Sequence, residues 1–160
     1  METRWLYTNS YDFPALREAS AYTCLIPMGC VEKHGLHLPL GQDLIQASHI
    51  AQMAAQMETV CVFPDFVFGD YSNAAPCQPA GTITLPVETE MLLLEQLCEQ
   101  ISRNGMKKIL ILNGHDPVGC NERIVKAALW IQAQRMADAF KVFKEDENVL
   151  KWHNEMQKGW

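Results

Sequence analysis

The sequence predicts an α/β fold in which helices cover both faces of a mostly parallel sheet, a three-layer α/β/α sandwich. Two observations support this prediction. Short runs that are almost wholly apolar alternate along the chain with longer segments that have helical spacing. Strands of a parallel sheet are buried on both faces, so they lack the polar alternation of a half-exposed strand. The 160 residues are 48% hydrophobic and 20% charged, which suits a single globular domain over residues 1–160.

Three apolar runs are the predicted strands. They cover residues 21–27, 60–63 and 108–112, and Pro64 ends the second of them. Residues 81–85 are expected to form a short edge strand. The long segment 65–80 has no periodicity and is rich in Gly, Pro, Asn and Ser, so we expect a loop there.

Helical spacing predicts the remaining elements, at residues 43–57, 86–104, 121–140 and 145–157. Asp43 is the expected N-cap of the first helix, with Gln46 as its capping-box partner. Gly105 is the expected C-cap of the second helix, because helices commonly end at a glycine in the left-handed conformation.

Charge and composition exclude several classes of partner. The net charge is −6 and the basic residues are scattered, whereas nucleic acids and anionic membranes select clustered Lys and Arg. No apolar run reaches the length of a membrane-spanning helix, and no apolar signal-peptide core follows the N-terminus. The six cysteines form no Cys-x-x-Cys pair, so we expect reduced thiols and a cytoplasmic protein.

Side chains that could bind a metal ion follow two of the predicted strands. Glu32 and His34 lie after the first strand and are two residues apart, so an extended backbone points them to the same side. Asp43 begins the next helix, and His115 directly follows the third strand. Ligands of parallel α/β sheets bind at the carboxyl ends of the strands, where these side chains should meet. Carboxylates and imidazoles suit zinc or another borderline divalent ion, and a carboxylate-bridged pair of ions could activate water.

Each of these residues also has a structural explanation. A single histidine near a strand end is more often a hydrogen-bonded structural residue than a ligand, and Asp43 is explained by helix capping alone. His37 is expected to be structural or to support the ligands. Cys30 and Cys120 are each close in sequence to a histidine, which leaves open a Cys/His hydrolase, but a buried unreactive thiol is the better explanation of both.

Three segments resemble the creatininase (creatinine amidohydrolase) family. Residues 26–43 read Ile-Pro-Met-Gly-Cys-Val-Glu-Lys-His-Gly-Leu-His-Leu-Pro-Leu-Gly-Gln-Asp. The family signature is similar: Pro-x-Gly-(Ser or similar)-x-Glu-x-His-Gly-x-His-Leu-Pro-Leu-x-x-Asp. Residues 79–82 resemble its Pro-Gly-Thr segment with Ala80 inserted, and residues 113–115 resemble its Asn-Gly-His turn. The segments occur in family order within residues 5 to 130.

The resemblance implies a creatininase-like α/β/α sandwich with one or two divalent ions, zinc or manganese. Glu32, Asp43 and His115 would hold one ion, and His34 would hold the other together with Asp43 as the bridge. It further implies that a metal-bound hydroxide hydrolyses a C–N bond of a small amide or cyclic amide, and that the protein is a homo-oligomer. The supporting or substrate-binding residues would be His37, Gly81, Thr82, Asn113, Gly114 and Asp116.

Three features depart from the family pattern. Pro117 stands where some members place a carboxylate ligand, and residues 70–78 lack an acidic-His pair that many members carry. No segment here resembles the later family motif whose Glu completes the second metal site. We therefore expect the C-terminal part of the family fold to be absent and residues 141–160 to form a divergent helical tail. An alternative stays open, a catalytically inactive, shortened creatininase-like protein with a structural or partner-binding role.

Overall fold

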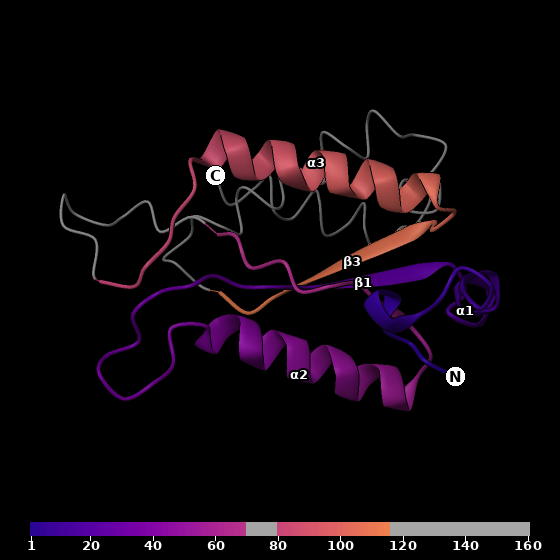
Figure 1. The fold of residues 1–160 in the computed structure, drawn as a ribbon, viewed down its shortest axis with the longest axis horizontal. Helices are drawn as coiled ribbons and strands as arrows, with labels where there is room; N and C mark the ends of the chain where they lie inside the picture. The colour runs from indigo at the N-terminus through magenta and orange to yellow at the C-terminus, as the bar shows by residue number, and fades with distance from the viewer. Residues whose placement is uncertain (70–79, 116–160) are drawn as a thin grey trace, which may run out of the picture.

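A parallel sheet lies between two helical layers in the computed structural model, which describes residues 1–69 and 80–115 (Figure 1). The strands β1 (Thr23–Met28), β2 (Cys61–Val62) and β3 (Lys108–Asn113) are parallel, in the order β2-β1-β3. Helix α2 (Gln42–Met57) covers one face of the sheet and helix α3 (Val87–Arg103) covers the other. The predicted three-layer α/β/α fold with a parallel sheet is therefore confirmed.

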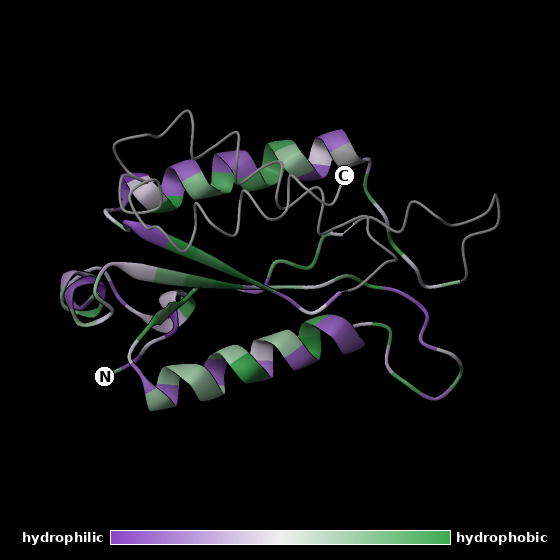
Figure 2. Ribbon diagram, turned by 180° about the vertical axis from the view of Figure 1, so that it is seen from behind, coloured by the Kyte–Doolittle hydropathy of each residue, from purple (hydrophilic) through white to green (hydrophobic). Residues whose placement is uncertain are grey.

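The central strand β1 is buried on both faces, which explains its unbroken apolar sequence. Cys24, Ile26 and Met28 pack in the core on the α3 side, together with Leu94 and other residues of α3. Leu25 packs on the opposite side against Ala51 and Ala55 of α2. Figure 2 shows that the strands are largely hydrophobic along their length, whereas α2 and α3 alternate between hydrophobic and hydrophilic residues.

Two short helices precede β1 and were not predicted, the 3-10 helix η1 (Trp5–Tyr7) and the helix α1 (Phe13–Ala19). Helix α1 has seven residues and buries only Leu16, so it carries no helical periodicity that a sequence pattern could reveal. Pro14 lies in its first turn, where the missing amide hydrogen has no cost.

The ends of the predicted elements show one success and two errors. Gly105 follows α3 in the predicted left-handed conformation, with φ 91°, and its N–H donates to the carbonyl of Ser102, although the C-cap itself is Asn104, one residue earlier. Gly41, not Asp43, is the N-cap of α2, and no side chain caps this helix. The expected edge strand at 81–85 is only an isolated antiparallel bridge between Ile83 and Val31.

Several predicted features lie outside the described residues. These are the helices at 121–140 and 145–157, the tail at 141–160, most of the loop at 65–80, and the candidate residue Asp116. Within residues 1–69 and 80–115, no helix combines the length and the apolar character that crossing a membrane requires.

Candidate metal centre

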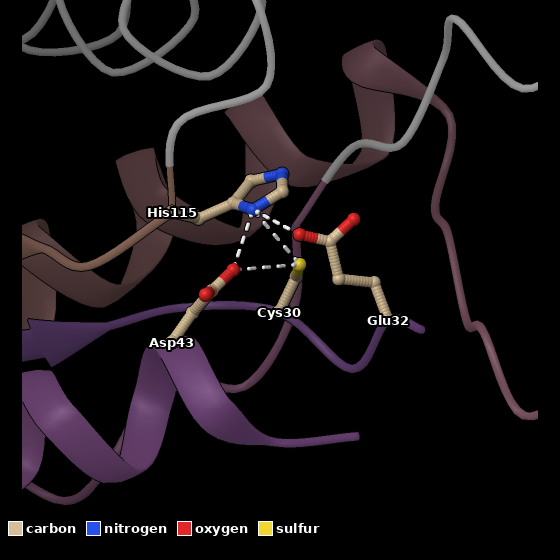
Figure 3. A group of neighbouring side chains, drawn as sticks. All are labelled: Cys30, Glu32, Asp43 and His115. Carbon is tan, nitrogen blue, oxygen red and sulfur yellow. Dashed lines mark hydrogen bonds and ion pairs between the residues drawn. The ribbon is translucent and has the colours of Figure 1, made fainter. Parts of the chain in front are cut away.

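The predicted ligands come from three segments that meet at the carboxyl edge of the sheet (Figure 3). Glu32 follows β1, His115 follows β3, and Asp43 lies in the first turn of α2. The pairing of β1 with β3 continues past the strands, because the N–H of Gly114 donates to the carbonyl of Met28 at 2.8 Å. The two loops that carry Glu32 and His115 are thereby held side by side.

Two glycines allow the first turn of α2 to approach these loops closely. A Cβ atom on Gly29 would lie 2.5 Å from the backbone nitrogen of Leu44, and one on Gly114 would lie 2.3 Å from the carbonyl oxygen of Asp43. Both distances are shorter than any real Cβ contact, so only glycine fits at either position. This close packing places the carboxylate of Asp43 between the two loops.

Asp43 directs its two carboxylate oxygens toward different histidines. Its Oδ2 lies 2.7 Å from Nδ1 of His115, and its Oδ1 lies 2.9 Å from Nε2 of His34. Oε1 of Glu32 lies 3.0 Å from Nδ1 of His115 and 3.4 Å from Nε2 of His34. The structure therefore brings together the four residues predicted as ligands, and the geometry of Asp43 suits a bridging carboxylate.

Cys30 also belongs to this cluster, which the sequence interpretation missed. Its Sγ lies 3.1 Å from Nδ1 of His115 and 3.6 Å from Oδ2 of Asp43. The sequence contained a usable signal, because Cys30, Glu32 and His34 are successive alternate residues and an extended backbone sends alternate side chains to one side.

The cluster has the dimensions of a site for a divalent cation. Ligand atoms of Cys30, Glu32, Asp43 and His115 all lie within 4.8 Å of one another, and all four residues are buried. Bonds of roughly 2.1 Å in a tetrahedron place ligand atoms roughly 3.4 Å apart. The contacts of Nδ1 of His115 and of Sγ of Cys30 within the cluster range from 2.7 to 3.6 Å and bracket this value. The chemistry of the donors, two carboxylates, an imidazole and a thiol, also fits a zinc-like ion.

Electrostatics in the cluster disfavour negative charge when no cation balances it. Burial raises the pKa of the Glu32 carboxyl, partly offset by His115, and the hydrogen bond with Asp43 raises it further. Burial also raises the pKa of the Cys30 thiol, and the nearby carboxylates of Glu32 and Asp43 add to this effect. A divalent cation would reverse this balance by stabilising the charged forms.

Neighbouring polar groups hold the ring of His34 and the backbone of His115 in place. Nδ1 of His34 lies 3.3 Å from the carbonyl oxygen of Glu32, a pairing that places the proton on Nδ1 and leaves Nε2 available as a ligand. The side chain of Asn113 bonds twice to the backbone of His115, accepting from its N–H at 3.1 Å and donating to its carbonyl at 2.8 Å. Nε2 of His115 is buried and meets no hydrogen-bond partner in the described part of the chain.

The other candidate residues support the ligand loop and do not join the cluster. Thr82 accepts a hydrogen bond from the N–H of Lys33 through its Oγ1 at 3.3 Å. Gly81 has φ 90°, and a Cβ there would lie 2.6 Å from a methyl carbon of Leu40. His37 is exposed, and its ring lies beside Gly35. Gly81 and Thr82 thus hold the loop after β1 in place.

Comparison with known proteins decides the family. The family model "Creatininase: Creatinine amidohydrolase" matches residues 8–159, nearly the whole chain. The chain belongs to the creatininase family. It is similar to creatinine amidohydrolase of Pseudomonas putida, with 22% identity over 107 residues, which cover 65% of this chain and 41% of that protein. It is also similar to 3-dehydro-scyllo-inosose hydrolase of Thermotoga maritima, with 26% identity over 91 residues, which cover 57% of this chain and 29% of that protein.

Solved creatininase structures share the fold. A structure named "Creatininase Mn" superimposes with a TM-score of 0.77 at 18% identity, over 87% of this chain and 54% of that one. A mutant creatininase of Zn–Zn type gives a TM-score of 0.75 at 16% identity, over 95% of this chain and 63% of that one. The chain therefore spans between about a third and two-thirds of the lengths of these family members.

Proposed function

We propose that this chain binds a divalent metal ion, zinc or manganese, and hydrolyses a C–N bond in a small amide or cyclic amide. The observation that carries the proposal is Asp43, whose two oxygens face His34 and His115 at 2.9 and 2.7 Å beside the carboxylate of Glu32. Membership of the creatininase family supports it, as do the relatives named for creatinine hydrolysis and the creatininase structures named for manganese and zinc.

The proposed ligands form two groups, one for each of two metal ions. Glu32, Oδ2 of Asp43 and Nδ1 of His115 would hold the first ion, and Nε2 of His34 with Oδ1 of Asp43 would bind the second. When bound, such ions polarise a carbonyl group and lower the pKa of water toward neutrality.

The chain itself positions the reacting groups. Asp43 sets the spacing of the two halves of the site, because the tight packing at Gly29 and Gly114 fixes the first turn of α2. The carbonyl of Glu32 orients the ring of His34, and Asn113 orients the backbone of His115. A site of this kind is preorganised, so little reorganisation is needed when a substrate binds.

We also propose that the protein is cytoplasmic and forms a homo-oligomer. The four cysteines in the described residues are free and buried, as expected in a reducing compartment. Several large apolar side chains are exposed on α2 and on the loop before it, a surface that suits a second copy of the chain: Leu36, Ile45, Ile50, Met53 and Met57.

Hydrolysis assays on the full chain test the proposed activity. Zinc-loaded and manganese-loaded protein would be offered creatinine, other cyclic and linear amides, and 3-dehydro-scyllo-inosose, which the name of one relative suggests. We expect the wild-type protein to hydrolyse an amide. A chelator should abolish this activity, added metal should restore it, and Asp43→Asn should lack it. His49→Asn is the matched control, because His49 is an exposed histidine of α2 that does not belong to the cluster.

Two outcomes would contradict the proposal. Hydrolysis that continues at the wild-type rate in Asp43→Asn would place the chemistry elsewhere. Metal bound at full occupancy without turnover of any compound would support the alternative, an inactive creatininase-like protein in which the metal is structural.

A further inference from the structure

We propose that Cys30 is a ligand of the first metal ion and that its sulfur makes this site prefer zinc over manganese. The inference rests on the metal site proposed above and adds a ligand to it. It concerns which ion the chain selects, which the carboxylates and histidines alone leave undecided.

Cys30 is fixed in position by the sheet. It comes two residues after the end of β1, where the N–H of Gly29 donates to the carbonyl of Phe66 at 3.1 Å and extends the pairing beyond the strand. Cys30 is completely buried, with an exposed fraction of 0%. Figure 3 shows its side chain directed toward Asp43 and His115, between the loop of Glu32 and the first turn of α2.

The distances around the sulfur, which are hydrogen-bond contacts in this structure, are compatible with ligands that share one ion. A zinc–sulfur bond of roughly 2.3 Å and a zinc–nitrogen or zinc–oxygen bond of roughly 2.1 Å place the two ligand atoms roughly 3.6 Å apart in a tetrahedron. The Sγ of Cys30 lies 3.6 Å from Oδ2 of Asp43 and 3.1 Å from Nδ1 of His115. With Oε1 of Glu32, these atoms offer one sulfur, one nitrogen and two oxygens as possible ligands.

A thiolate ligand changes which metal binds best. Manganese prefers oxygen ligands, whereas zinc binds thiolate, imidazole and carboxylate together. Glu32, Asp43 and His115 alone would accept either ion. The addition of Cys30 therefore shifts the preference of the first site toward zinc.

The surroundings of Cys30 do not suit a catalytic nucleophile. A nucleophilic thiol must reach the substrate, but this side chain is enclosed and lies next to the carboxylate of Asp43. Reactive cysteines occupy positively charged and partly exposed surroundings. The structure thus favours metal ligation over the Cys/His hydrolase that the sequence left open.

Spectroscopy of the full chain tests the proposal without depending on activity. Metal-free protein would be loaded with Co²⁺, whose bond to a thiolate gives a charge-transfer band in the near ultraviolet. We expect this band in the wild type and in Cys98→Ser, a control that alters a buried cysteine of the α3 core, and its loss in Cys30→Ser. In a competition experiment, the ratio of zinc affinity to manganese affinity should fall by about tenfold or more in Cys30→Ser. Even changes to residues around metal ligands alter metal affinity by about 10- to 100-fold.

X-ray absorption at the zinc edge of the wild type keeps the test independent of how any variant folds. We expect one zinc-bound sulfur per chain, at roughly 2.3 Å from the zinc. Cys120→Ser removes the other cysteine that is close in sequence to a histidine, and it should keep this sulfur. Bound zinc or cobalt with no sulfur in its shell would overturn this inference and leave the metal site intact. A wild-type chain that binds no metal would overturn both.

Discussion

Replacement of Gly29 by alanine should disable the metal site from a position that bears no ligand atom. The added Cβ would lie 2.5 Å from the nitrogen of Leu44 and 3.0 Å from the carbonyl carbon of Asp43, both backbone atoms that cannot rotate away. To restore an ordinary contact of 3.4 Å, the first turn of α2 must retreat by about 0.9 Å. Metal–ligand distances tolerate deviations of only about 0.2 Å, so the carboxylate of Asp43 would leave coordination range.

We expect Gly29→Ala to lower zinc affinity by about 100-fold or more, the upper end of what changes around metal ligands cause, and to cost about 1–3 kcal/mol of stability through overpacking. Isothermal titration with zinc and urea unfolding measure the two effects. Gly41→Ala is the matched control, because a Cβ there would meet only the side chain of Ile45, at 3.9 Å. Wild-type zinc affinity in Gly29→Ala would refute the argument that tight packing positions Asp43.

Three further predictions concern the ligands themselves. Asp43→Asn should bind no zinc in titration calorimetry, because Asp43 faces both His34 and His115, whereas the exposed His49→Asn should bind it as the wild type does. Wild-type zinc binding by Asp43→Asn would contradict the assignment. Glu32→Gln should stabilise the metal-free chain by about 0.5–2 kcal/mol at neutral pH. Burial raises the pKa of the Glu32 carboxyl above its ordinary value of 4.5, so the ionised carboxylate destabilises the folded chain at neutral pH, and the neutral amide of Gln removes this cost. The gain should shrink in urea unfolding at pH 4, where the carboxyl is largely protonated in both states, and an equal gain at both pH values would contradict the electrostatic explanation. Free zinc at about 100 times its Kd should raise the free energy of unfolding by about 2.7 kcal/mol, a gain that His115→Ala should lack in thermal melts with and without chelator.

The sequence predicted those parts of the fold whose burial leaves a periodic pattern. β1 and β3 are long enough and apolar enough to be recognised, and alternate residues of β1 pack on opposite helical layers. Helix α1 escaped prediction because it buries a single side chain. Residues 81–85 were predicted as a strand from their composition, but only one bridge forms there.

The candidate site was predicted in part for a similar reason. Spacing after two strands is enough to bring Glu32, His34 and His115 to one edge of the sheet. The role of Asp43 was ambiguous, because a carboxylate at the start of a helix suits both capping and metal binding. In the structure Gly41 is the N-cap and Asp43 faces His34 and His115. This placement depends on the packing at Gly29 and Gly114, which involves contacts distant in the sequence. Cys30 was missed because a cysteine beside an apolar strand resembles an ordinary core residue.

Anomalous X-ray diffraction from crystals of the zinc-loaded chain tests the central claim most directly, because it locates the ion without reference to activity. We predict an anomalous peak at the zinc edge within roughly 2.0–2.3 Å of Oε1 of Glu32, Oδ2 of Asp43 and Nδ1 of His115. Crystals of His115→Ala treated in the same way should lack this peak. A wild-type map with no peak among these atoms, or with zinc bound only elsewhere, would contradict the assignment of this cluster as the metal centre.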